Sequence, residues 1–147
     1  MSTLQHARLE VVENVPLARH TYRVRLHGPD LAAGVEDFRA AGAEVHLSSD
    51  DGTLGERGFV TQLLARHDKP GHVVGCGPEP MLHALAELTT RWGVPCQASL
   101  ETPMACGVGV CFSCVARVRV DPGWDYRRVC VEGPVFEAER LAWEDPA

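Results

Sequence analysis

The hydrophobic and polar positions at the start of the chain alternate. Residues 7–13 and 21–27 each place apolar and polar side chains in turn, and Pro16 lies between the two segments. Alternation with a period of two residues predicts half-buried strands, so we expect an N-terminal β-hairpin. Because two strands alone are marginally stable, a further element is expected to pack on this hairpin.

Between residues 34 and 95 the pattern changes to alternating helices and strands. The clearest segment predicts a helix with proline in its first turn, glycine at its end and an apolar, core-facing stripe. Helices that follow strands return the chain in the same direction, so we expect a small α/β layer with parallel strands. The predicted elements are strands over residues 44–48 and 71–75 and helices over 36–41, from Gly58 and over 79–92, the last with the stripe Met81, Leu85, Leu88 and Trp92.

The C-terminal third of the chain predicts a small β domain. Residues 96–100 begin a strand, and residues 115–120 alternate apolar and polar side chains. Asp121-Pro122-Gly123 is typical of a turn that reverses the chain. We therefore expect residues 126–131 to return as a paired strand.

Composition and charge exclude some functional classes. The 147-residue chain has a net charge of −6, and its 14 Lys and Arg residues are scattered, which counts against a nucleic-acid partner. No stretch approaches the roughly 18 uninterrupted apolar residues of a membrane span, and residues 1–6 lack the layout of a secretory signal. We therefore expect a cytoplasmic protein, in which six cysteines favour thiol, metal or redox chemistry over disulfides.

Four cysteines near the C-terminus carry the most specific chemistry. Their spacing, Cys-x4-Cys-x2-Cys with a distant fourth cysteine, is that of plant-type 2Fe–2S ligation, whereas structural zinc sites use paired Cys-x2-Cys motifs. Zinc is the alternative ligand. The glycines between the first two cysteines allow a loop to turn its backbone amides toward the sulfur atoms. The predicted metal ligands are Cys106, Cys111, Cys114 and Cys130.

Neighbours of these cysteines are expected to support the cluster. Cys130 should approach the three-cysteine loop from an adjacent strand. Val108, Val110 and Phe112 are expected to keep water away from the metal, and Trp124 and Tyr126 to shield or pack rather than conduct electrons.

Two other turns are candidate nucleotide sites. Cys76 and Gly77 lie where a strand ends and a helix begins, which is where open α/β sheets place ligands. An ordinary strand-to-helix turn is the alternative there. The acidic turn Asp50-Asp51-Gly52 is a weaker candidate, because such turns are usually solvated loops. The seven histidines show no metal-ligand spacing, and Cys96 is predicted to be a small buried side chain.

These motifs together resemble one protein family. The chain is similar to the electron-transfer subunit of type B dihydroorotate dehydrogenase, a member of the ferredoxin reductase superfamily, and the likeness is strongest from about residue 36 to residue 143. The cysteine set is specific alone, and the other motifs are specific in combination. The segments that carry the likeness are Asp50-Asp51-Gly52-Thr53-Leu54-Gly55, Gly58-Phe59-Val60-Thr61, Cys76-Gly77-Pro78-Glu79-Pro80-Met81, Met104 to Cys111, and Arg127 to Phe136.

The resemblance implies a cofactor chain and a partner. In this family electrons pass between NADH, FAD, a 2Fe–2S cluster and FMN in a catalytic partner subunit, which oxidises dihydroorotate to orotate in pyrimidine biosynthesis. By resemblance the four cysteines are the cluster ligands, Cys76 and Gly77 lie near nicotinamide and flavin, and residues 50–52 belong to the nucleotide domain.

The chain also departs from the family pattern. The Arg-x-Tyr-Ser flavin motif and the glycine-rich loop of the nucleotide domain are absent. Near Leu31 to Val35 the chain jumps from the first strands of the barrel into the latter part of the nucleotide domain. We therefore expect an internally truncated protein: residues 1–33 as a remnant of the flavin-binding β-barrel, 34–95 as a partial ferredoxin reductase-like nucleotide domain, and 96–147 as the 2Fe–2S domain. The missing motifs count against FAD binding and NADH oxidation by this chain alone, so it is expected to be an oxidoreductase subunit.

Three alternatives to an electron-transfer subunit stay open. The first is a non-catalytic docking module. The second is a deletion product that self-associates through exposed strand edges, and the third is the reductase subunit of another ferredoxin- or sulfide-linked NAD(P)H oxidoreductase. Residues 133–136, Gly-Pro-Val-Phe, favour the dihydroorotate system over the last of these.

Overall fold

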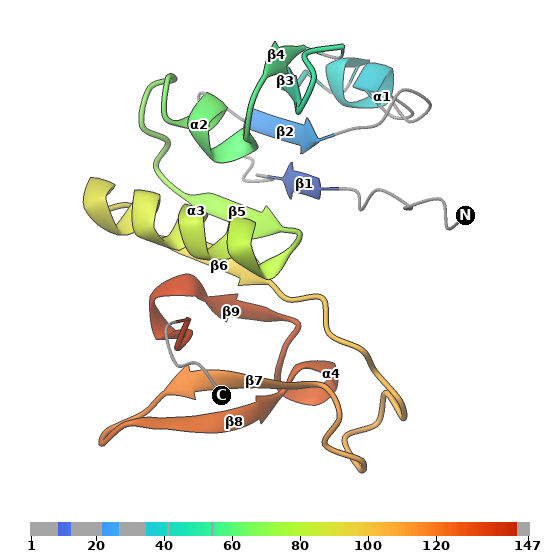
Figure 1. Cartoon of the computed structure of the whole chain (residues 1–147), viewed down its shortest axis with the longest axis vertical. Coiled ribbons are helices and arrows are strands. Elements are labelled where there is room, and N and C mark those ends of the chain that lie inside the picture. Colours follow the sequence, from blue (N-terminus) through green and yellow to red (C-terminus); the bar gives the residue numbers. More distant parts are fainter. Residues whose placement is uncertain (1–8, 13–21, 27–34, 41, 54, 144–147) are drawn as a thin grey trace.

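The structure is a computed structural model that describes residues 9–12, 22–26, 35–40, 42–53 and 55–143 (Figure 1). In chain order its elements are β1 (Leu9–Val12), β2 (Tyr22–Leu26), α1 (Val35–Ala40), β3 (Glu44–Ser49), β4 (Glu56–Arg57), α2 (Val60–Leu64), β5 (Val73–Cys76), α3 (Glu79–Trp92), β6 (Cys96–Ser99), β7 (Val115–Arg119), β8 (Trp124–Arg128), α4 (Val129–Glu132), β9 (Val135–Glu137) and the 3-10 helix η1 (Ala138–Arg140).

Most of the described strands form one mixed sheet, in the order β4-β3-β2-β1-β5-β6-β9. The pairs β2–β3, β3–β4 and β5–β6 are parallel, and the pairs β1–β2, β1–β5 and β6–β9 are antiparallel. The mixed α/β class is therefore confirmed, and so is the N-terminal hairpin β1–β2. This hairpin lies between β3 and β5, so the two strands of the expected parallel layer are not neighbours. The expected chain junction near Leu31 lies outside the described residues.

Both outer strands of this sheet are short. Among the described residues, β4 has two residues and β9 has three. Short edge strands offer few unpaired backbone groups to another chain, which is a common protection against edge-to-edge association.

Helix α3 packs directly on β5 and β6. Its ends follow the sequence signals, with Pro78 as N-cap, Pro80 in the first turn and Gly93 in the left-handed conformation at φ 67°. Leu85 and Leu88 of the predicted stripe are buried. Met81 and Trp92 are half-buried against the same core, and the fully buried Leu82 belongs to it as well. Burial of each such leucine stabilises the fold by about 1.5–3 kcal/mol.

A glycine allows α3 to approach the sheet this closely. A Cβ atom on Gly75 of β5 would overlap the side chain of Leu85. Because β5 ends immediately after this glycine, the contact also fixes the position of the Cys76-Gly77 turn.

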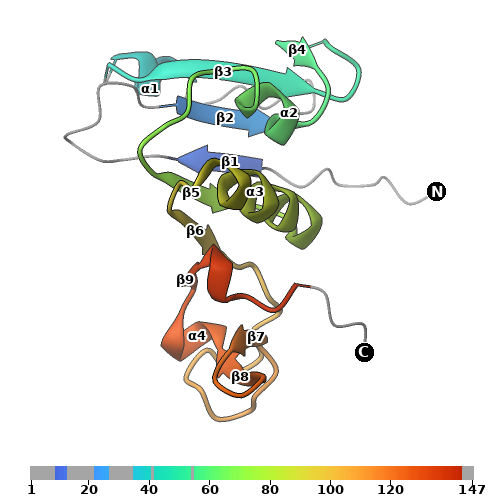
Figure 2. The ribbon, with the colours of Figure 1, turned by 90° about the vertical axis from the view of Figure 1, so that its left-hand side faces the viewer.

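The hydrophobic core continues from α3 into the C-terminal part of the chain. Val118 of β7, Ala138 of η1 and Leu141 belong to the same buried cluster as Leu82 and Ala98. Strand β9 joins the large sheet by pairing with β6. Figure 2 shows β7, β8 and α4 at the end of the molecule that lies beyond β6 and β9. A shared core and a shared strand therefore attach the cysteine-bearing part to the sheet.

The expected strand over residues 126–131 is wrong in its second half. Strands β7 and β8 pair as predicted, from Val115 opposite Arg128 to Arg119 opposite Trp124, but β8 ends at Arg128 and the chain continues as helix α4. The carboxylate of Glu132 accepts a hydrogen bond from the backbone N–H of Arg128 at 2.8 Å, which stabilises this single helical turn. None of the helices in the described part of the chain has the length and apolar character needed to cross a membrane.

Candidate metal centre

Three of the four predicted ligands lie on one loop, and α4 carries the fourth. The loop runs from the end of β6 to the start of β7 and contains Cys106, Cys111 and Cys114, whereas Cys130 lies in α4. The backbone N–H of Val129 donates to the carbonyl oxygen of Cys114 at 2.7 Å, which joins the two segments. The expected approach of the fourth cysteine from a strand is thus corrected to an approach from a helical turn.

Backbone amides surround the sulfur atom of Cys106. The N–H of Val110 donates to Cys106 Sγ at 3.4 Å. Hydrogen bonds from the backbone of Cys111 and of Val108, followed by those from the Cys111 side chain and Val110, lower the pKa of Cys106 to about 6. Such donors favour the thiolate, which is the form that binds a metal.

Cys114 and Cys130 form a second thiol pair. The backbone N–H and the thiol of Cys130 donate to the Cys114 sulfur and lower its pKa. The pKa of Cys130 is raised, mainly because its thiol proton is shared with Cys114, while the backbone of Gly109 acts in the opposite direction. The thiol of Cys130 therefore favours the thiolate form of Cys114.

The four thiols are grouped as the pairs Cys106–Cys111 and Cys114–Cys130. In the described part of the chain, no three His, Cys, Asp or Glu side chains are placed to hold one metal ion together. A 2Fe–2S cluster has two irons, each of which takes two protein ligands. Two thiol pairs, with backbone N–H donors directed at their sulfur atoms, fit such a cluster.

Gly109 allows the loop to pass close to α4. Its φ of +81° lies in the left-handed region, and the residue is buried. A Cβ atom at this position would lie 2.6 Å from Cγ2 of Val131 in α4. Glycine therefore meets two requirements here, one of backbone conformation and one of space.

Two residues that the sequence did not single out hold the loop in shape. Ser113 Oγ accepts from the backbone N–H of Ala105 at 3.1 Å and lies 3.1 Å from Cys111 Sγ. Arg128 Nη1 donates to the carbonyl oxygen of Gly109 at 3.1 Å. The position of Ser113 between two cysteines is only a weak sequence indication of its role. Arg128 precedes Glu132 by four residues, which is the spacing of a helical ion pair.

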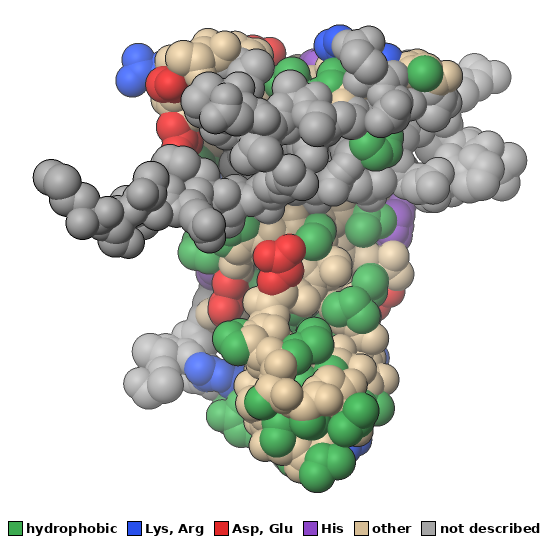
Figure 3. Space-filling view, turned by 90° about the vertical axis from the view of Figure 1, so that its right-hand side faces the viewer, with side chains coloured by type: hydrophobic (Ala, Val, Ile, Leu, Met, Phe, Trp, Pro, Cys, Tyr) green, Lys and Arg blue, Asp and Glu red, His purple; other side chains and the backbone are tan. Residues whose placement is uncertain are grey.

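Apolar side chains around the cysteines are exposed. Val108, Val110 and Phe112 have exposed fractions of 71%, 77% and 60%. The expected shielding role is therefore corrected: these side chains form an apolar surface beside the thiols. Figure 3 shows hydrophobic side chains gathered at the end of the molecule where Figure 1 places the loop and α4. We call this the cysteine-loop surface and define it by Met104, Val108, Val110, Phe112 and Val131.

The predicted nucleotide site at Cys76 and Gly77, which we call the nucleotide corner, differs in chemical character from the cysteine loop. Cys76 Sγ lies 3.6 Å from Oε1 of Glu101. Burial raises the pKa of the Cys76 thiol, and the charge of Glu101 raises it further, although a hydrogen bond with Ser99 opposes this. Cys76 is therefore held as a neutral thiol, in contrast to Cys106.

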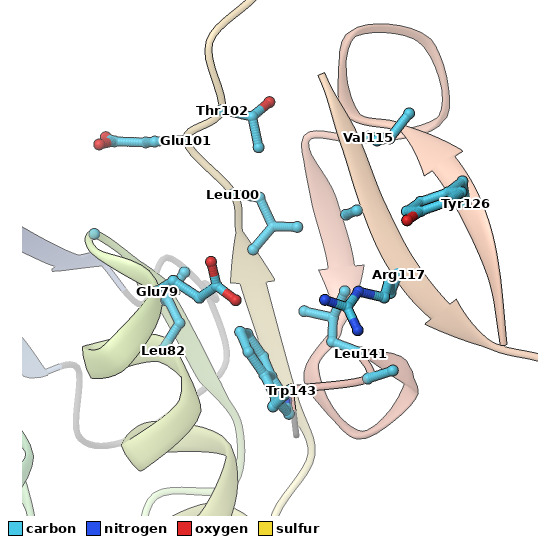
Figure 4. Close-up of a pocket in the computed structure, with 13 residues that line it drawn as sticks. Glu79, Leu82, Leu100, Glu101, Thr102, Val115, Arg117, Tyr126, Leu141 and Trp143 are labelled. Atoms are coloured by element: carbon cyan, nitrogen blue, oxygen red, sulfur yellow. The ribbon is translucent and has the colours of Figure 1, made fainter. Parts of the chain in front are cut away.

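Gly77 lines a cavity of about 320 Å³ between the start of α3 and β7. In Figure 4 Glu79 of α3 and Arg117 of β7 point toward each other across this cavity, Trp143 lies beneath them, and Glu101 points away. The cavity thus lies between the predicted corner and the cysteine-bearing domain.

The acidic turn lies apart from this corner. Because β3 and β5 run in the same direction, their ends at Ser49 and Cys76 share one edge of the sheet, but β2 and β1 separate them. Three strand spacings amount to about 14 Å. Asp51 Oδ1 accepts hydrogen bonds from the hydroxyl and backbone N–H of Thr53 at 2.7 and 2.9 Å, so its carboxylate is bonded within its own turn.

The remaining cysteine is a core residue. Cys96 is 7% exposed, and burial raises the pKa of its thiol, which confirms the predicted small buried side chain. All six cysteines lie in the described part of the chain, and each is a free thiol.

Four thiols, three on a loop and one on an adjoining helical turn of a mixed α/β fold, indicate the class of iron–sulfur proteins. Residues 101–142 match the family described as the iron–sulfur cluster binding domain of dihydroorotate dehydrogenase B. The electron transfer subunit of dihydroorotate dehydrogenase B (NAD(+)) from Caldanaerobacter subterraneus subsp. tengcongensis is 45% identical over 108 residues, which are 73% of this chain and 43% of that protein. Over this part the chain belongs to the family of electron transfer subunits of dihydroorotate dehydrogenase B.

Further relatives agree with this assignment. The corresponding subunits of Desulforamulus reducens and Bacillus caldolyticus are 38% and 46% identical and are covered over 40% and 39% of their length, by 69% and 70% of this chain. A solved structure of the NADH-dependent reduced ferredoxin–NADP oxidoreductase, described for flavin-based electron bifurcation, matches with a TM-score of 0.58 and 26% identity over 74% of this chain and 39% of that one. The chain thus spans about two fifths of the length of these proteins.

Proposed function

We propose that the chain is the iron–sulfur electron-transfer part of an NAD-linked dihydroorotate dehydrogenase, acting in pyrimidine biosynthesis. The observation that carries the proposal is the arrangement of four thiols as two pairs, with backbone amides directed at the sulfur atoms. The names of the relatives support the reaction, and the segment that matches the family model, residues 101–142, includes all four cysteines.

The chain's residues have distinct parts in this proposal. A bound 2Fe–2S cluster supplies one-electron transfer. Cys106 and Cys111 would hold one iron, and Cys114 and Cys130 would hold the other. The amide of Val110 stabilises negative charge on Cys106, and Gly109 brings the loop against α4. Ser113 fixes the loop between its second and third ligands.

The proposed electron partner is an FMN-containing catalytic subunit in the cytoplasm. The cysteine-loop surface supports docking next to the thiols, because exposed patches of apolar side chains often mark protein–protein interaction sites. A protein that seats on this surface would exclude water from the centre and shorten the path of the electron.

The domain plan and the nucleotide residues belong to the same proposal. Residues 1–33 represent the flavin-barrel remnant, 34–95 the partial nucleotide domain and 96–147 the cluster domain, with β6 at their junction paired in the large sheet. Cys76 and Gly77 lie near the nicotinamide and flavin of the complete enzyme, and Asp50 to Gly52 in its nucleotide domain. FAD and NAD binding require parts that the motifs of this chain do not supply, so electron transfer is its own contribution.

Metal and sulfide analysis tests the proposal. Protein reconstituted anaerobically with iron and sulfide is assayed for iron, acid-labile sulfide and zinc, and its visible spectrum is recorded before and after dithionite. We expect equal iron and sulfide and reversible bleaching. Cys114→Ser should lose both, while Cys96→Ser, a matched control outside the ligand set, should retain both. Colourless protein that holds zinc and no sulfide would contradict the proposal.

A docking module is the second candidate function, and the exposed cysteine-loop surface is the observation that favours it. In that case binding to a dehydrogenase subunit would persist in Cys114→Ser, since no electron transfer is needed. The short edge strands β4 and β9 count against a product that self-associates through open edges. Size-exclusion chromatography of the wild-type chain separates these cases.

A further inference from the structure

Arg128 occupies a position between the two ligand-bearing segments. Its side chain contacts the loop at two points, through the hydrogen bond from Nη1 to the carbonyl oxygen of Gly109 and through its guanidinium 5.2 Å from the ring centre of Phe112. Its Nε donates to Glu132 of α4 at 3.2 Å. These contacts bracket Cys111 on the loop side and lie two residues from Cys130 on the other.

The hydrogen bond to Gly109 continues to a ligand sulfur. The carbonyl oxygen of Gly109 and the N–H of Val110 belong to the same peptide group, and that N–H donates to Cys106 Sγ at 3.4 Å. Resonance couples the oxygen and nitrogen of a peptide group, so a positive donor on the oxygen makes the N–H a stronger donor. The guanidinium of Arg128 thus acts on the Cys106 sulfur through one peptide group.

We propose that Arg128 is a positioning residue that raises the reduction potential of the bound cluster, by clamping the loop to α4 and by polarising the Gly109–Val110 peptide group toward Cys106. The inference rests on the proposed function, because it concerns the same thiols. Reduction adds one electron with no bond formed or broken, and negative charge on the sulfur ligands increases. Hydrogen bonds to the sulfur atoms and nearby positive charge favour that state.

The neighbouring arginine provides a matched control. Arg127 pairs with Asp125 at 2.6 Å and with Glu132 at 3.6 Å, and the hydrogen bonds that the structure gives it are to Asp125 and the carbonyl oxygen of Tyr126. Arg127→Gln removes the same charge as Arg128→Gln one residue away, but it leaves the contact with Gly109 intact. A comparison of the two variants therefore separates the peptide relay from net charge.

A redox titration of the reconstituted full chain, followed by visible absorption and by electron paramagnetic resonance, tests this inference. At a fixed potential, we expect the ratio of reduced to oxidised cluster in Arg128→Gln to fall by about twofold to tenfold, where tenfold is about 59 mV for one electron. Arg127→Gln should shift less. Arg128→Lys keeps the charge without the planar fork, so its potential should lie between those of the wild type and Arg128→Gln.

Each outcome bears on the inference. Equal shifts in Arg128→Gln and Arg127→Gln, or no shift in either, would overturn it. If Arg128→Gln does not retain the cluster, Arg128→Lys decides: a potential below that of the wild type supports the relay, and an unchanged potential refutes it. Failure of the wild-type chain to bind any iron and sulfide would instead refute the proposed function, so the two failures are distinguishable.

Discussion

The cysteine loop and the acidic turn at residues 50–52 are both glycine-containing turns that follow a strand of the large sheet, yet they use their polar groups in opposite ways. In the acidic turn, Asp51 accepts hydrogen bonds from Ser49 and Thr53, each two residues away. In the cysteine loop, backbone N–H groups are directed at sulfur atoms, and one of them serves Cys130, 21 residues further along.

This difference shows why a lowered pKa alone does not mark a functional site. Hydrogen bonds from the hydroxyl and the backbone of Thr53 are the main cause of the lowered pKa of Asp51. Hydrogen bonds lower the pKa of Cys106 as well. The carboxylate is bonded within its own turn, whereas the thiols converge from two segments. Convergence of groups from separate elements is the stronger indication of a ligand site.

The largest contrast is expected from substituting the groups that accept these hydrogen bonds. Cys130→Ser should abolish cluster binding, because it removes one of the two thiolates of an iron. Asp51→Asn should leave iron and sulfide at the wild-type level, because the acidic turn lies on a different strand end. Iron and sulfide assays of the reconstituted variants measure both effects. Equal loss in both variants would mean that the two turns form one site.

The next contrast lies between two glycines of the cysteine loop. Gly107→Ala and Gly109→Ala both place a side chain at positive φ, +68° and +81°, which costs about 1–2 kcal/mol. A Cβ at position 107 has free space, whereas one at position 109 meets Val131 of α4. We expect Gly109→Ala to lose most of its cluster and Gly107→Ala to keep it. Iron content per chain decides this, and similar retention by both variants would show that the approach to α4 is unimportant.

The same test applies to glycines on either side of β3, with stability as the expected effect. Gly55→Ala would bring a Cβ against the carbonyl oxygen of Leu47, whereas Gly42→Ala meets open space, and both residues have positive φ. Gly42→Ala should lower the free energy of unfolding by about 1–2 kcal/mol and Gly55→Ala by more. Neither should change the cluster content. Urea unfolding followed by circular dichroism measures the difference, and a larger loss in Gly42→Ala would contradict it.

The smallest effect concerns the charge of Asp51. Its pKa is lowered below the ordinary value of 3.8 by the hydrogen bonds from Thr53. A carboxyl group whose pKa is lower in the folded state stabilises the fold above the unfolded pKa and loses that contribution as the pH falls through the folded pKa. The stability difference between the wild type and Asp51→Asn should therefore be constant near pH 7 and decrease below about pH 4. A difference that grows with acid would contradict the assignment.

The sequence predicted the loop ligands because their spacing is a covalent constraint. Cys106, Cys111 and Cys114 are close along the chain, so their approach depends little on the rest of the fold. Cys130 was included in the predicted ligand set, but it was assigned to a strand and lies in helix α4. The reversing turn at residues 121–123 favours a returning strand over residues 126–131, and the helical turn forms instead because Glu132 reaches the N–H of Arg128.

Features that depend on tertiary packing were less accessible from the pattern. The apolar residues Val108 and Val110 were expected to cover the metal, since hydrophobic side chains are usually buried. Both side chains are exposed instead, and each residue follows a glycine with positive φ. Strand β9 has three residues, too few for an alternating pattern, and forms by pairing with β6. The role of Arg128 depends on a carbonyl group 19 residues earlier, which no local spacing indicates.

The most direct test of the central claim is X-ray absorption at the iron edge of the reconstituted wild-type chain. Ligation by the pairs Cys106–Cys111 and Cys114–Cys130 predicts four sulfur neighbours for each iron and one short iron–iron vector. Iron with sulfur neighbours but without an iron–iron vector, or with nitrogen or oxygen neighbours instead, would contradict the two-iron centre.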